Sequence, residues 1–226
     1  MGLQKKIILP SIALGLATFI MQASESVISV CFNSSLLKYG GDIAVGAMTI
    51  LTSVMQFAML PLQGLGQGAQ PIISYNYGAK NVKRVKNAFW MLLKVSLSYA
   101  VLLWAFIMIF PQGFAGMFTS DPELLIFTKT ALRIYTACLF LFGIQMACQM
   151  TFTSLGKAGS SIIVAVMRKF VLLIPLIYIM PVILSNKKDI AVYMAEPIAD
   201  FFAVSFTAVL FFFQFRKCMR QIETGK

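Results

Sequence analysis

Long, continuous apolar runs constrain this chain more than any other feature of its sequence. Hydrophobic residues make up 59% of the 226 residues and charged residues only 12%, against roughly 25% charged in a typical soluble domain. With so few charges, the chain cannot cover a surface that faces water. The runs extend for about 20 residues or more and lack the apolar–polar alternation of a membrane strand, so they predict transmembrane helices. We therefore expect an all-α, polytopic membrane protein.

Turn-forming residues between the apolar runs divide the chain into six predicted helices. Gly-Gly-Asp, Gly-Ala-Lys, Asp-Pro and Gly-Lys-Ala-Gly sequences separate the runs and are typical of turns. No linker is long enough to split the chain, so residues 1–226 form a single membrane domain. The predicted helices span residues 7–37, 43–77, 82–110, 124–155, 160–184 and 190–215. Several exceed the length needed to cross a bilayer and must tilt or project beyond it.

Positive charges are concentrated on one side of the predicted helices. The formal net charge is +11, and most lysines and arginines flank the helix ends that share a side with the chain termini. The positive-inside rule places that side in the cytoplasm. Both termini are then cytoplasmic, which agrees with an even number of spans. The basic residues therefore indicate membrane topology, with the lipid bilayer as partner, rather than nucleic-acid binding.

Residue types needed for common catalytic and metal sites are absent or scattered. The sequence has no histidine, which removes Ser–His and Cys–His catalysis and most zinc sites. None of its four cysteines is arranged as Cys-x-x-Cys, and three fall within apolar runs. We therefore expect neither an enzyme nor a bound metal or cofactor.

The first predicted helix carries a polar face inside an apolar run. Gln22, Glu25 and Asn33 recur at helical spacing, with Ser26 and Ser29 on the same face. Glu25 lies about 28 Å along the helix from Lys6, well inside the membrane. A carboxylate at that depth should face a cavity or a partner. We interpret Glu25 as a site for an ion, a proton or a substrate; the alternative is a carboxyl group that only joins helices.

The second predicted helix carries a row of amide and hydroxyl side chains. Their oxygens could coordinate cations and their N–H groups could bind a ligand; alternatively, they hydrogen-bond neighbouring helices. Pro61 and Pro71 each remove a backbone hydrogen bond and are expected to kink the helix. The predicted substrate-cavity residues of this helix are Gln56, Gln63, Gln67, Gln70 and Ser74.

Polar residues in the later helices extend the predicted cavity. Arg168 is expected to lie in the bundle, whereas its neighbour Lys169 could snorkel to the membrane surface. Glu196 and Asp200 are four residues apart on one face of the last helix. They could bind a cation or line an exit path, or alternatively form an ion pair or a cap. The cavity residues proposed in these helices are Gln145, Gln149, Arg168, Glu196 and Asp200.

The stretch from Pro61 to Lys80, PLQGLGQGAQPIISYNYGAK, resembles the eighth-helix signature of the multidrug and toxic compound extrusion (MATE) family. The resemblance is greatest to its bacterial MepA-like branch and covers nearly the whole chain. Other segments are similar to the family as well: MQASES at 21–26, SLGKAG at 154–159, RKFVLLIPL at 168–176 and AEPIAD at 195–200.

The resemblance implies one lobe of a two-lobe transporter. MATE transporters have two related six-helix lobes, and this chain resembles the C-terminal one. The implied function is antiport of H⁺ or Na⁺ against organic, often cationic, drug-like compounds by alternating access. Glu25 matches the family's seventh-helix glutamate, implicated in cation coupling, with Gln22 and Asn33 beside it. Gln145 stands where some members carry an aspartate, which leaves the choice between H⁺ and Na⁺ open.

The resemblance also implies partners and a location. The chain is expected in the bacterial cell (inner) membrane, facing either a missing N-terminal lobe or a second copy of itself. The alternative function is that of a truncated or inactive half-transporter, with only a role in structure or assembly.

Overall fold

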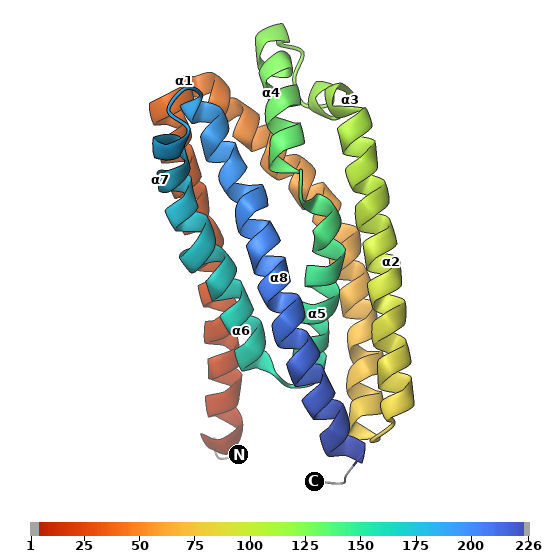
Figure 1. Ribbon diagram of the computed structural model, residues 1–226. Coiled ribbons are helices and arrows are strands. Elements are labelled where there is room, and N and C mark those ends of the chain that lie inside the picture. Colours follow the sequence, from red (N-terminus) through yellow and green to blue (C-terminus); the bar gives the residue numbers. More distant parts are fainter. Residues whose placement is uncertain (1–4, 224–226) are drawn as a thin grey trace.

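A computed structural model describes the backbone of residues 5–223 and the side chains of residues 23–223 apart from Ala158. Within that part of the chain every regular element is a helix, and the helices form an elongated bundle (Figure 1). Among residues 23–223, four helices are long and apolar enough to cross a membrane, and a bent pair makes a fifth. The prediction of an all-α, polytopic membrane protein is confirmed.

The first element, α1 (Lys5–Gly78), turns back on itself at Gly41 and so crosses the bundle twice (Figure 1). Gly41 has φ +62° and ψ −159°, a left-handed conformation that glycine adopts at little cost. The turn lies in the Tyr39-Gly40-Gly41-Asp42 sequence that predicts one. We call residues 5–40 the first limb of α1 and residues 42–78 the second limb. With the two limbs counted separately, the described chain makes six traverses of the bundle.

The second limb runs as helix through both of its prolines. Inside α1, the described backbone departs from helical dihedral angles at Gly41 and not at Pro61 or Pro71. The helix is therefore continuous at both prolines.

The helix α2 (Val82–Ile109) packs closely against α5 (Phe142–Ser154). It begins at Asn81, whose side-chain oxygen accepts a hydrogen bond from the backbone N–H of Arg84 at 3.1 Å, as an N-cap residue does. On α5, a Cβ atom added to Gly143 would lie 2.6 Å from the Cα of Leu97. Glycine at this position therefore allows the two helix backbones to approach each other.

The fourth traverse is broken rather than continuous over 124–155 as the sequence predicts. The helix α4 (Pro122–Tyr135) ends before a short 3₁₀ segment, η1 (Leu139–Leu141), and α5 continues at an angle of 43°. The indole N–H of Trp104 on α2 donates to the carbonyl of Ala137 at 3.1 Å. This contact satisfies a carbonyl group within the break, so a tertiary interaction supports it. A short helix, α3 (Pro111–Gly116), connects α2 to α4.

The last two traverses pack along each other (Figure 1). One consists of α6 (Ala158–Val166), a π-helical segment η2 (Met167–Leu173) and α7 (Ile174–Ile183). The other is α8 (Lys188–Glu223), which extends past the predicted end at residue 215. Tyr193 of α8 is fully buried, and its hydroxyl donates to the carbonyl of Ala44 at 2.6 Å. This bond ties α8 to α1 just after the bend.

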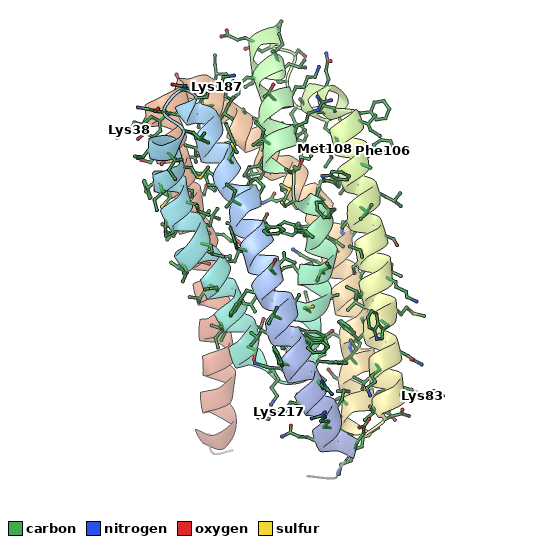
Figure 2. All side chains as sticks on the ribbon, in the orientation of Figure 1. Lys38, Lys83, Phe106, Met108, Lys187 and Lys217 are labelled. Atoms are coloured by element: carbon green, nitrogen blue, oxygen red, sulfur yellow. The ribbon has the colours of Figure 1, made fainter. Side chains whose placement is uncertain are left out.

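Basic residues gather at the end of the bundle where α2 begins and α8 ends, as predicted from the sequence. The residues are Lys83, Arg84 and Lys86 of α2 and Arg216, Lys217 and Arg220 of α8. The start of α1 and the end of α8 lie at the same end (Figure 1), where Lys83 and Lys217 also lie (Figure 2). Lys38 and Lys187 lie at the opposite end (Figure 2). We call the end with Lys83 and Lys217 the basic end.

Candidate functional site

Glu25 on the first limb and Lys169 on η2 form a salt bridge between two helices. A carboxylate oxygen of Glu25 lies 2.6 Å from the Lys169 ammonium nitrogen, which also donates to the Ser24 hydroxyl at 3.1 Å. The Lys169 side chain is 8% exposed, whereas that of Glu25 is 59% exposed. The expectation that Lys169 snorkels to the surface is wrong, because Glu25 and Ser24 provide acceptors within the bundle. The Glu25 carboxylate, in contrast, is accessible from outside the bundle.

Arg168, the preceding residue, joins two carboxylates of α8. Its Nε donates to Asp200 and its Nη2 to Glu196, both at 2.7 Å. Its guanidinium carbon also lies 5.2 Å from the ring centre of Phe142, a cation–π distance. The Asp200 and Glu196 side chains are 3% and 7% exposed. Of the roles considered for these two acids, the structure shows the ion pair.

The local geometry of η2 explains how two adjacent cations serve different helices. Consecutive residues on a helix point in different directions, so Lys169 reaches α1 while Arg168 reaches α8. Glu196 and Asp200 are one turn apart on α8 and present their carboxylates to the same guanidinium. A π-helical segment is rare and is often found at functional sites. The adjacent basic pair therefore connects the first limb of α1, η2 and α8.

These five residues form one charge cluster with a surplus negative charge. Glu25 also interacts electrostatically with Arg168 and Glu196. Three carboxylates against two cations leave a formal charge of −1 when all five groups are ionised. In addition, the second carboxylate oxygen of Glu196 is buried and has no hydrogen-bond partner within the described residues. We call Glu25, Arg168, Lys169, Glu196 and Asp200 the charge cluster.

The polar row of the second limb lies mostly on the surface. Gln56, Gln63 and Gln67 are exposed and Gln70 is half-buried. Ser74 instead turns towards α5, where its hydroxyl donates to the carbonyl of Ser154 at 3.0 Å. The structure therefore presents an uncovered glutamine face, made of Gln56, Gln63 and Gln67, and places Ser74 in a helix contact.

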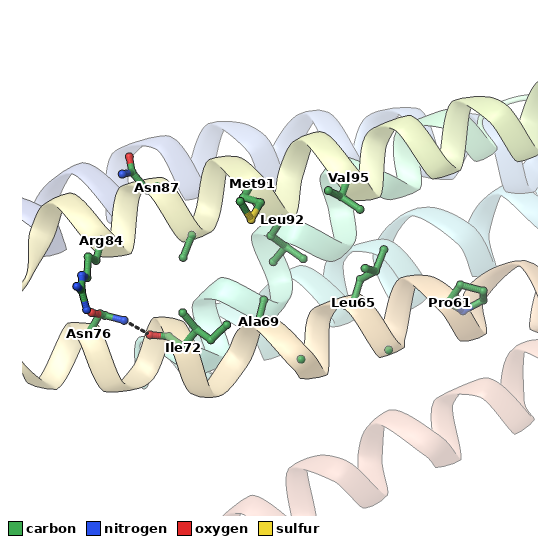
Figure 3. A pocket seen from close by; sticks show the side chains of 13 residues that line it. Pro61, Leu65, Ala69, Ile72, Asn76, Arg84, Asn87, Met91, Leu92 and Val95 are labelled. Carbon is green, nitrogen blue, oxygen red and sulfur yellow. Dashed lines mark hydrogen bonds between the residues drawn. The ribbon is translucent and has the colours of Figure 1, made fainter.

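A groove of about 810 Å³ lies between the second limb and α2 (Figure 3). Small and apolar residues line it, including Gly64, Gly68, Ile72 and Met91, and Arg84 and Asn76 lie at one end (Figure 3). Asn76 donates to the carbonyl of Ile72 at 2.8 Å. The glutamines predicted to form a substrate cavity are not part of this lining. The groove and the glutamine face are therefore different surfaces of the same helix.

The remaining predicted site residues are dispersed. Asn33 is exposed on the first limb, and Gln149 is half-buried on α5. Gln145 is 5% exposed, and its side-chain oxygen has no hydrogen-bond partner among the described residues. The side chain of Gln22 lies outside the described residues. The structure therefore joins Glu25, Arg168, Glu196 and Asp200 of the predicted set, and adds Lys169 and Phe142.

Comparison with known proteins identifies the family. The family model MatE matches residues 17–179. The chain belongs to the MATE family. The match covers well over half of the chain, and this confirms the resemblance found in the sequence.

Curated relatives within the MATE family are multidrug export proteins. MepA of Staphylococcus saprophyticus subsp. saprophyticus is 26% identical over 180 residues, which cover 78% of this chain and 38% of that protein. MepA of Staphylococcus haemolyticus is 22% identical over 167 residues, which cover 74% of this chain and 36% of that protein. The chain thus spans about two fifths of the length of these relatives.

Solved MATE structures show which part of the fold is present. A MATE transporter in the bent conformation superposes with a TM-score of 0.89 at 20% identity, covering 99% of this chain and 49% of that one. The MATE multidrug transporter DinF-BH gives a TM-score of 0.79 at 33% identity, covering 93% of this chain and 46% of that one. The bundle therefore has the fold of one MATE lobe. Members of this family are transporters rather than enzymes.

Proposed function

We propose that this chain is one lobe of a cation-coupled multidrug exporter, and that the salt bridge between Glu25 and Lys169 is its coupling element. The observation that carries the proposal is the unequal exposure of the pair. Lys169 is held inside the bundle, whereas the Glu25 carboxylate is more than half exposed. An arriving cation can therefore reach the carboxylate and compete with Lys169 for it.

The charge of the cluster supports binding of a single positive charge. One surplus negative charge is unfavourable in apolar surroundings unless it is neutralised or paired. A proton on one carboxyl group, or one Na⁺ held by oxygen atoms, would balance it. Proton and Na⁺ coupling are both compatible with this arrangement, and organic cations are favoured as substrates for the same electrostatic reason.

Coupling to movement follows from where the salt bridge lies. When a cation neutralises Glu25, the buried Lys169 loses that carboxylate, which favours a different packing of η2 against the first limb. A ligand shifts a conformational equilibrium only when it binds one state better, and here cation binding and the salt bridge exclude each other. Such an exchange can drive alternating access between two lobes that rock around a central site.

The proposed exporter requires a second lobe. The glutamine face and Glu25 are polar surfaces without cover, and the chain matches less than half of each relative reported above. The other lobe is either a related N-terminal lobe or a second copy of this chain. We place the assembly in the bacterial cell membrane with the basic end in the cytoplasm, following the positive-inside rule.

Efflux of a fluorescent organic cation tests the proposal. This chain would be co-expressed with the N-terminal half of Staphylococcus saprophyticus MepA, or expressed alone to allow a homodimer, and ethidium efflux would be followed in inverted membrane vesicles. Glu25→Gln should abolish cation-driven efflux, whereas Glu123→Gln, an exposed acid at the opposite end of the bundle, should leave it unchanged. Equal efflux by the Glu25 variant and the wild type would refute the coupling role. No efflux in any pairing would favour the inactive half-transporter.

A further inference from the structure

A second groove, remote from the charge cluster, lies between α2 and α8 at the basic end. Its volume is about 630 Å³. Phe89, Phe211 and Phe215 line it and stack on one another, with ring centres 4.6 to 5.2 Å apart. This aromatic stack provides a rigid apolar floor for the groove.

Charged side chains surround the groove where it approaches the end of the bundle. Lys86, Arg216, Arg220 and Glu223 are part of its lining. Glu223 and Lys86 form an exposed salt bridge at 3.3 Å. Three cations and one carboxylate give these four side chains a formal charge of +2. An occupant of the groove would therefore meet apolar rings along its length and a net positive charge at one end.

The surface next to the groove is apolar and exposed. Trp90 and Phe212, which line it, are 55% and 60% exposed, and the neighbouring Phe213 is 67% exposed. Trp residues are enriched at the membrane–water interface, and Trp90 lies beside basic residues of the groove. The groove thus combines exposed aromatic and basic residues, a composition expected for a surface at the membrane–water interface.

We propose that this groove binds an anionic phospholipid from the leaflet at the basic end. The acyl chain lies along the aromatic floor, and the headgroup phosphate pairs with Arg216 and Arg220. The net positive charge favours an anionic headgroup over a zwitterionic one, because basic pockets between membrane helices select acidic lipids. A soluble anion would match only the charged end of the groove. The site lies apart from the proposed coupling element and does not depend on it.

Quenching of Trp90 fluorescence by brominated lipids tests the site. The full chain would be reconstituted in phosphatidylcholine vesicles that contain a small fraction of either dibrominated phosphatidylglycerol or dibrominated phosphatidylcholine. We expect the phosphatidylglycerol probe to quench at least about twofold more strongly at equal content, because basic residues near the membrane surface attract anionic lipids. The variant Trp90→Phe should lose this excess, because the other tryptophan, Trp104, lies in the opposite half of α2.

Matched charge variants distinguish a specific lipid site from general electrostatic attraction of anionic lipids to the basic end. Arg216→Gln with Arg220→Gln should remove the excess quenching, and the two lysine substitutions Arg216→Lys and Arg220→Lys should restore most of it. Lys83→Gln with Lys217→Gln removes the same charge from the same end, outside the lining, and should keep the excess. Equal quenching by both lipids, or equal loss in the two glutamine double variants, would overturn the proposal. Unchanged helix content by circular dichroism would show that each variant is folded.

Discussion

Lys169 is buried beside the half-exposed carboxylate of Glu25, with 2.6 Å between the charged atoms. Loss of the partner should therefore cost Lys169 more free energy than it costs Glu25. Water can solvate Glu25 when Lys169 is removed, whereas Lys169 remains enclosed when Glu25 is neutralised. This asymmetry has consequences for stability that can be measured on the chain by itself.

Glu25→Gln is expected to destabilise the chain more than Lys169→Met does. Loss of the carboxylate leaves a buried ammonium group less well compensated, which should lower the free energy of unfolding by about 2 kcal/mol, below the roughly 3–5 kcal/mol typical of a broken pair that is fully buried. Lys169→Met replaces the charge with an apolar side chain of similar length and should cost less. Unfolding in mixed micelles of mild detergent and sodium dodecyl sulfate would give both values.

The double variant provides the internal control for this pair. Glu25→Gln combined with Lys169→Met should recover most of the stability lost in Glu25→Gln, because the buried ammonium group that has lost its carboxylate is also removed. Additive losses in the double variant would show that the two side chains do not interact energetically.

Arg168 should be the least replaceable residue of the charge cluster. Arg168→Met would leave Glu196 and Asp200, both nearly fully buried, without a cation, at a cost of roughly 3–5 kcal/mol. Arg168→Lys should rescue little, because an ammonium group cannot reproduce the forked contact with two carboxylates. Arg133→Met, at an exposed position in the last turn of α4, is the matched control and should change stability by less than about 0.5 kcal/mol. A rescue by lysine to wild-type stability would contradict the role of the guanidinium geometry.

The sequence predicts features that depend on local chemistry. Gly40 and Gly41 indicate a turn, and Gly41 is where the backbone adopts a positive φ. The depth of Glu25 in an apolar run indicates that it needs a partner. The identity of that partner could not be predicted. Lys169 is distant from Glu25 in sequence, and a lysine side chain at this position is equally compatible with snorkelling to the membrane surface.

The break between α4 and α5 was unpredictable for a related reason. No proline or glycine occurs between Thr136 and Leu141, so local propensity favours a continuous helix. The carbonyl of Ala137 accepts a hydrogen bond from Trp104 on another helix, and that support becomes visible only in three dimensions. Likewise, helical periodicity groups Ser74 with the glutamines, but it cannot show that Ser74 contacts α5.

Gly143 is expected to be intolerant of substitution because of its contact with α2. A Cβ atom there would lie 2.6 to 2.7 Å from backbone atoms of Leu97 and Ser96, which cannot move aside as a flexible side chain can. Gly143→Ala should therefore separate the two helices at a cost of roughly 1–3 kcal/mol. Gly64→Ala is the matched control, because a Cβ atom there meets nothing within 4 Å. Thermal unfolding in detergent should show a lowered midpoint for the first variant and no loss for the second.

Lys169 should also set the affinity of the coupling site for its cation. If the ammonium group competes with the coupling ion for Glu25, Lys169→Gln removes the competitor, and the site should bind the ion more tightly. We expect half-maximal efflux at a cation concentration lowered by about tenfold or more, which corresponds to at least about 1.4 kcal/mol of lost competition. Maximal efflux should fall as well, because the salt bridge is no longer available to stabilise the cation-free state.

The measurement is the dependence of ethidium efflux on pH and on Na⁺ in vesicles that contain both lobes. Lys94→Gln, which changes an exposed lysine of α2, is the control. A half-saturating concentration that stays at the wild-type value would show that Lys169 is a structural partner of Glu25 and not a competitor for the site.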